Sequence, residues 1–275
     1  MTRSPAEVVG SLIAGITAGR WTELAALYAT DTVVEHPLLK TRLTGRQALE
    51  EHFARASGRK LEAFDVVLHE TTDPEVVIAE YGYRFPGCTT ANVQVVRVRD
   101  GLITHSRDYH DHLLMAVARS APVEATPPGP VPGGPLPEVP DGSPQSVLLR
   151  LLTLPLESRA DLYAEDAYVT HPFHPGAPAL RGRDELREHF AGGPSAVPAP
   201  RNVVFHQGID PEMIVTEFTY TGDALVAHNI FVSRVSGGRI TESRDYADHV
   251  AFAAAAGRLP ELVAAARSAL GQAPT

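Results

Sequence analysis

The chain of 275 residues contains the same series of sequence blocks twice. Four blocks recur in the same order, with an offset of 135 residues for the first (Leu27 to Leu162) and 137 for the others (as from Ser106 to Ser243). A repeat of this length indicates two duplicated domains rather than a solenoid of short repeats. The matching blocks are residues 27–37 with 162–172, 45–54 with 182–191, 73–83 with 210–220, and 106–112 with 243–249.

Between the two copies lies a segment rich in proline and glycine, residues 121–144 (APVEATPPGPVPGGPLPEVPDGSP). Such a segment cannot bury enough apolar surface to offset the entropy lost on ordering, and its prolines favour an extended spacer. We therefore predict one domain at residues 1–120, a linker at 121–144 and a second domain at 145–275. Both domains have an ordinary size for an independent fold.

The composition limits the classes of partner. Hydrophobic residues make up 44% of the chain and charged residues 21%, a balance typical of globular proteins. A formal net charge of −9 argues against nucleic acid as a partner, because phosphates repel an acidic chain. The single cysteine, Cys88, excludes an internal disulfide, and no apolar run is long enough to span a membrane. We expect a soluble, cytoplasmic protein with no membrane partner.

The order of elements within one copy predicts the fold class. Helical spacing of apolar residues comes first and strand-like runs come last, which favours an α+β fold with an antiparallel sheet. The second copy repeats this order and ends in an alanine-rich helix at 250–270, interrupted by Pro260. The elements predicted in the first copy are helices at 4–18, 21–29 and 45–56, a short extended segment at 33–37, and strands at 61–70, 75–84, 91–99 and 102–110.

Three motifs in this order resemble a known family. A His-Pro pair after the second helix, a GRxxLxxHF helix and a final G-x-I-x-x-x-R-D-Y strand are similar to the SnoaL-like branch of the nuclear-transport-factor-2-like superfamily. The resemblance implies a cone, in which helices wrap a strongly curved sheet around one apolar pocket. Single-domain relatives commonly form dimers, so we predict that the tandem copies form an intramolecular pseudo-dimer, as a monomer or within a higher homo-oligomer.

Asp108 and Asp245 lie in the last predicted strand of each copy, within the sequence SRDY. Strand alternation places Ser106 and Asp108 on one face and Arg107 on the other. If the first face lines the pocket, burial raises the pKa of the carboxyl group and suits it to move protons. The resemblance implies the same role, because related cyclases and phenazine enzymes use an acid at this position as general acid/base. The alternative is a structural ion pair with the neighbouring Arg107 or Arg244.

Two pairs of histidines recur in both copies. His52 and His189 precede the core phenylalanine of the matched helix, and the resemblance to the phenazine enzymes implies that they assist the acid in catalysis. The alternative is a histidine on the helix surface. His36 and His171 precede a proline at the end of the extended segment, and we interpret them either as substrate-binding residues or as hydrogen-bonded turn residues.

Other repeated polar residues are candidates for substrate binding. A phenol or an amide can hold a carbonyl or enolate oxygen, and a second carboxylate would allow the acid and base roles to separate. Each type also occurs routinely as a core, strand-start or cross-strand residue. The candidates are Tyr28 with Tyr163, Asn92 with Asn229, and Glu80 with Glu217.

Metal and cofactor sites are not expected. The run from Asp108 to His112 contains ligand types, but the second copy has Ala247 in place of His110. A strand H-x-H pair also needs a further ligand from elsewhere, for which the sequence offers no motif. Glycine-rich phosphate or dinucleotide loops, a nucleophile elbow and a zinc-protease motif are absent from the sequence.

The resemblance leaves two classes of function open, because the superfamily includes both enzymes and binding modules. The first is a cofactor-free acid/base enzyme of secondary metabolism, a cyclase, isomerase or dehydratase acting on an apolar polyketide-like or aromatic carbonyl compound. The alternative is a non-catalytic protein that binds or sequesters a hydrophobic small molecule. Both need a small-molecule partner and no cofactor.

Overall fold

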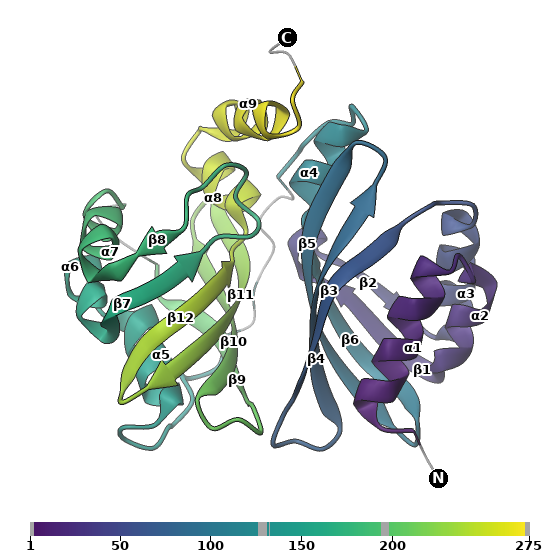
Figure 1. Ribbon diagram of the computed structural model, residues 1–275, viewed down its shortest axis with the longest axis horizontal. Helices are drawn as coiled ribbons and strands as arrows, with labels where there is room; N and C mark the ends of the chain where they lie inside the picture. The colour runs from purple at the N-terminus through teal and green to yellow at the C-terminus, as the bar shows by residue number, and fades with distance from the viewer. Residues whose placement is uncertain (1–2, 126–130, 132, 194–197, 273–275) are drawn as a thin grey trace. The chain divides into compact units, whose positions relative to one another are not determined.

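The computed structural model describes residues 3–125, 131, 133–193 and 198–272 and divides the chain into two compact units. The first unit extends to Val123 and the second spans Glu124–Ala269 (Figure 1). Part of the predicted linker, residues 126–130 and 132, lies outside the described residues. Each unit contains a six-stranded sheet with its own helices, as the duplicated sequence predicts.

In the first unit the six strands form a single open sheet in the order β2-β1-β6-β5-β4-β3. Strand β1 runs parallel to β6, and the other neighbouring pairs are antiparallel. Figure 1 shows α1, α2 and α3 together over one face of this sheet. The elements are α1 (Pro5–Thr17), α2 (Trp21–Leu24), a 3-10 turn (Ala25–Leu27), β1 (Tyr28–His36), a second 3-10 turn (Pro37–Leu39), β2 (Thr41–Thr44), α3 (Arg46–Ala56), β3 (Glu62–Glu70), β4 (Val76–Phe85), β5 (Cys88–Arg99), β6 (Leu102–His110) and α4 (His112–Ala118).

The second unit repeats this plan with the strand order β8-β7-β12-β11-β10-β9, and β7 runs parallel to β12. Its elements are α5 (Pro144–Thr153), α6 (Leu156–Arg159), a 3-10 turn (Ala160–Leu162), β7 (Tyr163–Thr170), β8 (Leu180–Arg181), α7 (Gly182–Ala191), β9 (Pro200–Gln207), β10 (Met213–Gly222), β11 (Leu225–Ser236), β12 (Arg239–Tyr246), α8 (His249–Ala255) and α9 (Leu259–Ala269).

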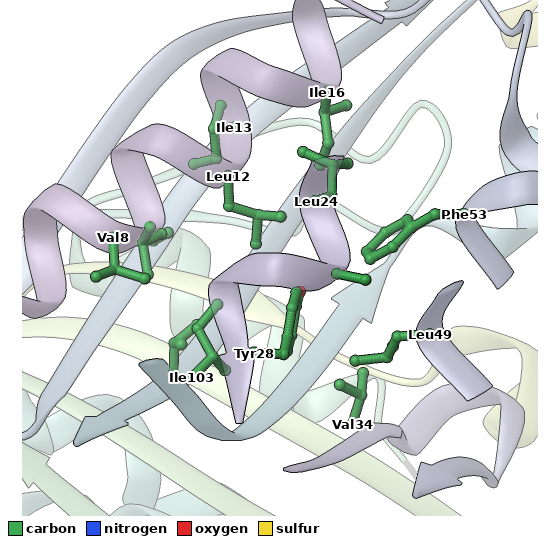
Figure 2. Packing of buried hydrophobic residues seen from close by; sticks show 14 of the residues in the cluster. Val8, Leu12, Ile13, Ile16, Leu24, Tyr28, Val34, Leu49, Phe53 and Ile103 are labelled. Atoms are coloured by element: carbon green, nitrogen blue, oxygen red, sulfur yellow. The ribbon is translucent and has the colours of Figure 1, made fainter. Parts of the chain in front are cut away.

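Helix α1 shows why the helices begin where they do and which face they bury. Ser4 accepts a hydrogen bond from the backbone of Glu7, whose carboxylate accepts one from the backbone of Ser4, and Pro5 occupies the first helical position. This capping box satisfies donors that the first turn leaves open. The helix then buries an apolar stripe that packs with residues of α2, β1 and α3 (Figure 2). The labelled residues of this core are Val8, Leu12, Ile13, Ile16, Leu24, Tyr28, Val34, Leu49, Phe53 and Ile103.

A bulge at the same place in both units bends the outer strand. In β3 the pairing shifts between Phe64 and Val67, and Asp65 has a φ of 50°. In β9 the pairing with β10 shifts at Asn202, which also has a φ of 50°. Bulges of this kind bend the strand and increase its twist, so the sheet is locally curved at this point in each unit. The curvature predicted from the family resemblance is therefore present in the backbone.

The structure corrects two predictions about the start of each copy. The sheets are mixed rather than antiparallel, and the helix expected at 21–29 ends at Leu24, because Tyr28 already pairs with Ile103 of β6. The spacing of Leu24 and Leu27 is helical only over a short stretch, and the β-branched residues that follow continue the chain as β1. Pairing with a distant strand therefore overrides the local helical pattern.

The predicted C-terminal helix is two helices. Helix α8 ends at Ala255, and Gly257, with a φ of 68°, breaks the chain direction before α9 begins at Leu259. Pro260 lies in the first turn of α9, where the absence of an N–H group costs nothing. The interruption therefore comes before the proline rather than at it. Among the described residues, no helix combines the length and apolar character needed to cross a membrane.

Candidate active sites

In each unit the candidate residues gather around a cavity between the curved sheet and its helices, and residues of that unit alone line it. The first cavity has a volume of about 860 Å³, and its walls include apolar side chains from α1, α3 and β4. The second has a volume of about 480 Å³. Volumes in this range suit a small organic molecule. Eight of the twelve candidate site residues line these cavities: Tyr28, His36, His52 and Asp108 in the first, and Tyr163, His171, His189 and Asp245 in the second.

Asp108 lies on the cavity face of β6 and is only 6% exposed. Ser106, two residues earlier on the same face, donates a hydrogen bond to one carboxylate oxygen. Burial raises the pKa of Asp108 above its ordinary value, and charge on His36 and hydrogen bonds from Ser106 and Gln94 oppose that rise. Ser106 was missed as a supporting residue, although strand alternation already placed it beside the acid.

The ion pair that the sequence left open for this aspartate is not formed. Arg107 points to the opposite face of β6, where its guanidinium lies 3.7 Å from the carboxylate of Glu35. In the second unit Arg244 bonds to Glu242. Neither arginine is among the groups that shift the pKa of Asp108 or Asp245. Both carboxyl groups therefore face their cavities without an ion pair to the arginine that precedes them in the strand.

Asp245 occupies the equivalent position in the second cavity and accepts a hydrogen bond from Ser243. Burial raises the pKa of Asp245 to about 7. Opposite it on β11 stands Phe231, where the first unit has Gln94 opposite Asp108. The acid of the second unit therefore has an aromatic neighbour in place of an amide, in a smaller cavity.

Four histidines reach the first cavity. His52 is exposed on α3 at the cavity mouth, and its ring centroid lies 6.2 Å from that of His36. His110 and His112 also line the cavity, and the ring of His110 lies 6.0 Å from that of His36. Burial lowers the pKa of His52 below its ordinary value, and that of His112 to about 4. The imidazoles of His52 and His112 are therefore mostly neutral at neutral pH, and each offers one donor and one acceptor nitrogen.

The second cavity also contains four histidines, but one comes from a different part of the chain. Ala247 replaces the histidine of β6, and His174, in the loop after β7, lies with its ring centroid 4.8 Å from that of His249. His171 and His189 stack with their centroids 5.3 Å apart. Burial lowers the pKa of His171 to about 4 and that of His249 to about 3.

Tyr28 and Tyr163 begin the first strand of each unit and are almost fully buried at the cavity wall. Burial, reinforced by the nearby aspartate, raises the pKa of both phenols well above the ordinary value. The backbone carbonyl of each tyrosine accepts a hydrogen bond from an arginine, Arg46 or Arg183, that fixes the start of the strand. Both phenols therefore remain protonated and are available as hydrogen-bond donors.

The asparagines lie behind the cavities rather than in their walls. Asn92 is fully buried, donates to the carbonyl of Tyr81 at 3.3 Å and lies 2.7 Å from Nδ1 of His110 through its Oδ1. Asn229 accepts from the backbone of Asp248 at 3.2 Å. Neither asparagine lines a cavity, so the geometry argues against direct contact between these residues and a substrate. Asn92 instead holds a cavity histidine in place.

The glutamates point away from the cavities. Glu80 alternates along β4 with Tyr81 and Tyr83, which pack on the cavity side, and its carboxylate lies 2.6 Å from Nε2 of His69. Glu217 makes the same contact with His206 at 2.9 Å. We therefore remove both glutamates from the candidate sites: they are buried cross-strand pairs on the other face of the sheet.

Solved structures that resemble this chain include a candidate isomerase from Bacillus subtilis, with 20% sequence identity, a TM-score of 0.40, and coverage of 42% of this chain and 93% of that one. A candidate polyketide cyclase from Xanthomonas campestris pv. campestris has 21% identity, a TM-score of 0.34, and coverage of 38% and 87%. The epoxide hydrolase/cyclase-like enzyme SalBIII, described for pyran ring formation in the polyether salinomycin, has 18% identity, a TM-score of 0.35, and coverage of 38% and 88%. A comparison with curated proteins finds no match.

The sequence matches the family described as the SnoaL-like domain at residues 9–106 and again at 155–243. One match falls in each unit, and together they cover more than half of the chain. The first match begins within α1 and the second begins after α5, and both end at the serine that supports the aspartate. The chain therefore belongs to the SnoaL-like domain family and carries two copies of that domain.

Proposed function

We propose that the chain is a cofactor-free acid/base enzyme of secondary metabolism, a cyclase, isomerase or dehydratase acting on an apolar polyketide-like or aromatic carbonyl compound. One observation carries the proposal: each unit holds a buried carboxyl group, with its pKa raised by burial, at the wall of a largely apolar cavity. A carboxyl of this kind exchanges a proton with a carbon or oxygen acid near neutral pH.

The second unit provides the clearest proton donor and acceptor. With a pKa of about 7, Asp245 is present in both ionised and protonated forms at neutral pH. The ionised form removes a proton from the carbon next to a carbonyl group, and the protonated form returns it at another position. The phenol of Tyr163 supports the charge that develops on the carbonyl oxygen, because it stays protonated in the same cavity.

His52 and His189 support this reaction from the cavity mouths. Burial lowers the pKa of both below the ordinary value, so the neutral imidazole predominates at neutral pH. A neutral imidazole carries one donor and one acceptor nitrogen and can relay the proton between the carboxyl group and solvent. His36 stacks with His52 and His171 stacks with His189, so each cavity has a pair of imidazoles near the proposed acid.

The proposal is tested by proton exchange in a simple aromatic ketone. 2-Tetralone in D₂O, followed by NMR, reports exchange of the hydrogens next to its carbonyl group. Asp108→Asn and Asp245→Asn each remove one carboxyl group at nearly constant shape. We expect each single variant to lose the part of the exchange rate that one cavity contributes. The double variant is expected to exchange about 10²–10⁴-fold more slowly than the wild type. Exchange by the double variant at the wild-type rate would reject the assignment.

The same experiment distinguishes the enzyme from a sequestering protein. Trp21 is the only tryptophan of the chain and lines the first cavity, so its fluorescence reports binding there. A fluorescence change on addition of 2-tetralone, with no exchange above background in the wild-type protein, would favour the binding protein. The cytoplasmic location and the intramolecular pairing of the copies stay predictions.

A further inference from the structure

Three metal-ligating side chains converge in the first cavity from neighbouring strands. Asp108 and His110 are two residues apart on β6 and share a face, and His36 ends β1, which pairs with β6. One donor atom from each lies within 4.8 Å of the other two. Ligand atoms about 2.1 Å from a tetrahedral Zn²⁺ ion lie roughly 3.4 Å apart, so small side-chain rotations suffice to bring these three onto one ion.

The hydrogen bonds behind His110 fix which of its nitrogens faces the cavity. The amide nitrogen of Asn92 donates to the carbonyl of Tyr81, so Oδ1 of Asn92 is left as an acceptor. Nδ1 of His110, 2.7 Å away, must then carry its proton, and Nε2 keeps its lone pair. A histidine that donates one N–H to an amide oxygen and offers its other nitrogen is the arrangement found behind metal ligands.

The other two side chains also keep a donor atom available. Nδ1 of His36 is buried, and no hydrogen-bond partner for it exists among the described residues. Ser106 donates to Oδ1 of Asp108 and Gln94 also bonds to this carboxyl group, but the two carboxylate oxygens together offer about four lone-pair sites, so acceptor capacity remains for an ion. A buried nitrogen without a partner is costly, and an ion between the three side chains would satisfy it.

The second unit provides an internal comparison. It has Ala247 at the position of His110, and its extra histidine, His174, enters from a loop. Within the part of the second unit that the structure describes, no three His, Cys, Asp or Glu donors gather in this way. Asp108 and His110 of the first copy needed a further ligand from elsewhere in the chain, and His36 is placed to supply it, whereas His112 begins α4 and is not one of the three.

We propose that the first cavity binds one divalent transition-metal ion through His36, Asp108 and His110. Two imidazoles and one carboxylate suit Zn²⁺, Co²⁺ or Fe²⁺ and not Mg²⁺ or Ca²⁺, which prefer oxygen ligands. The site shares Asp108 with the proposed function, and the two roles exclude one another, because a carboxylate bound to an ion is not free to carry a proton. Metal in the first cavity leaves proton transfer to Asp245.

Co²⁺ is the probe, since its visible absorption reports nitrogen and oxygen ligation. The full chain, stripped with a chelator and free of any histidine tag, is titrated with Co²⁺. We expect one ion per chain, displaced by Zn²⁺ and not by Mg²⁺. His110→Ala, which installs the residue that the second unit carries, is expected to weaken binding at least tenfold. His249→Ala is the matched control in the second cavity and is expected to bind as the wild type does.

Equal affinity in the wild type and His110→Ala, or no Co²⁺ spectrum in the wild type, would overturn the proposal. Asp108→Asn, which is nearly isosteric, carries the same test if His110→Ala does not fold. Hydrogen–deuterium exchange in 2-tetralone, measured with protein from which the metal has been removed, tests the proposed function separately. Either proposal can therefore fail without the other. Added Zn²⁺ is expected to inhibit exchange by Asp245→Asn, which uses the first cavity, and to spare Asp108→Asn. Inhibition of both variants alike would contradict the placement of the ion.

Discussion

Gln94 lies directly opposite Asp108 in the β5–β6 ladder and hydrogen-bonds its carboxyl group. That bond favours the ionised carboxylate and opposes the effect of burial on its pKa. The second unit has Phe231 opposite Asp245, and Ser243 is the one side chain that counters burial there. The Gln94 and Phe231 positions are therefore one difference between the surroundings of the two acids, alongside the charges on His36 and His105 that lower the pKa of Asp108.

Substitution of the residue that faces each aspartate across the ladder should move the pKa of that aspartate in a known direction. Phe231→Gln offers an amide donor to Asp245 and is expected to lower its pKa below the present value of about 7. Gln94→Phe removes a donor from Asp108 and is expected to raise its pKa. ¹³C NMR titration of the side-chain carboxyl groups measures both. A pKa of Asp245 that rises or stays constant in Phe231→Gln would show that the facing residue does not control it.

The serine beside each aspartate is expected to tune the same property. Ser243→Ala removes the hydrogen bond that lowers the pKa of Asp245, so the carboxyl group becomes harder to ionise. The rate of hydrogen–deuterium exchange in 2-tetralone rises with pH as Asp245 ionises, and in Ser243→Ala this rise should occur at higher pH. The measurement is made in the Asp108→Asn background, which leaves only the second cavity active. Ser243→Thr keeps a hydroxyl group and is the control. A lower rate with an unchanged pH profile would indicate a structural effect alone.

The raised pKa of Asp245 also predicts how stability depends on pH. The carboxyl group binds its proton more tightly when folded, with a pKa of about 7 against an ordinary value of 3.8. Between these values the folded state holds more protons, so this group destabilises the fold progressively as pH rises. The asparagine in Asp245→Asn does not ionise. As the pH rises from 4 to 7, the free energy of unfolding of this variant minus that of the wild type should increase by on the order of a few kcal/mol.

Urea unfolding at several pH values, followed by circular dichroism, measures this difference. Glu242→Gln is a suitable control, because it removes a half-exposed carboxylate of the same strand. A gap between Asp245→Asn and wild type that does not change with pH would mean that Asp245 has an ordinary pKa in the folded protein.

Two glycines of the first unit predict opposite effects on stability. Gly82 pairs with Phe64, and a Cβ there would lie 2.2 Å from the phenylalanine ring. Gly82→Ala must displace that ring and is expected to cost about 1–3 kcal/mol. Gly10, within α1, has nothing within 4 Å of such a Cβ, so Gly10→Ala is expected to stabilise the unit by about 0.5–1 kcal/mol. Trp21 fluorescence follows unfolding of both variants; a stabilised Gly82→Ala would contradict this reasoning.

The sequence predicted the α+β class and the four C-terminal strands of each unit because their signals are local, whereas the curvature of the sheets was predicted from the family resemblance. Alternating apolar residues and the turn at Asp100 and Gly101, both with positive φ, define the last hairpin without knowledge of the rest. Only the end of β1 was predicted, as the extended segment at 33–37, and its start was assigned to a helix, because its partner β6 lies more than 70 residues away and the pairing is parallel. A local pattern contains no information about such a partner.

The site residues could be predicted where the alternation of side chains along a strand assigns them to one face of the sheet. In β6 the aspartate, its serine and His110 follow the same two-residue period, so His110 could also have been assigned to the cavity. Strand β4 is buried on both faces, and its pattern could not tell whether Glu80 or Tyr81 faces the cavity. His174 belongs to a loop with no counterpart in the first copy, so comparison of the two copies could not predict that it lines the cavity.

Because the lining of each cavity is drawn wholly from its own domain, a single molecule contains both a test site and its reference. An altered residue on one side can be judged against the untouched duplicate under identical concentration, temperature and solvent. Evolution has the same freedom: one pocket can drift toward a new ligand while the other preserves the ancestral chemistry.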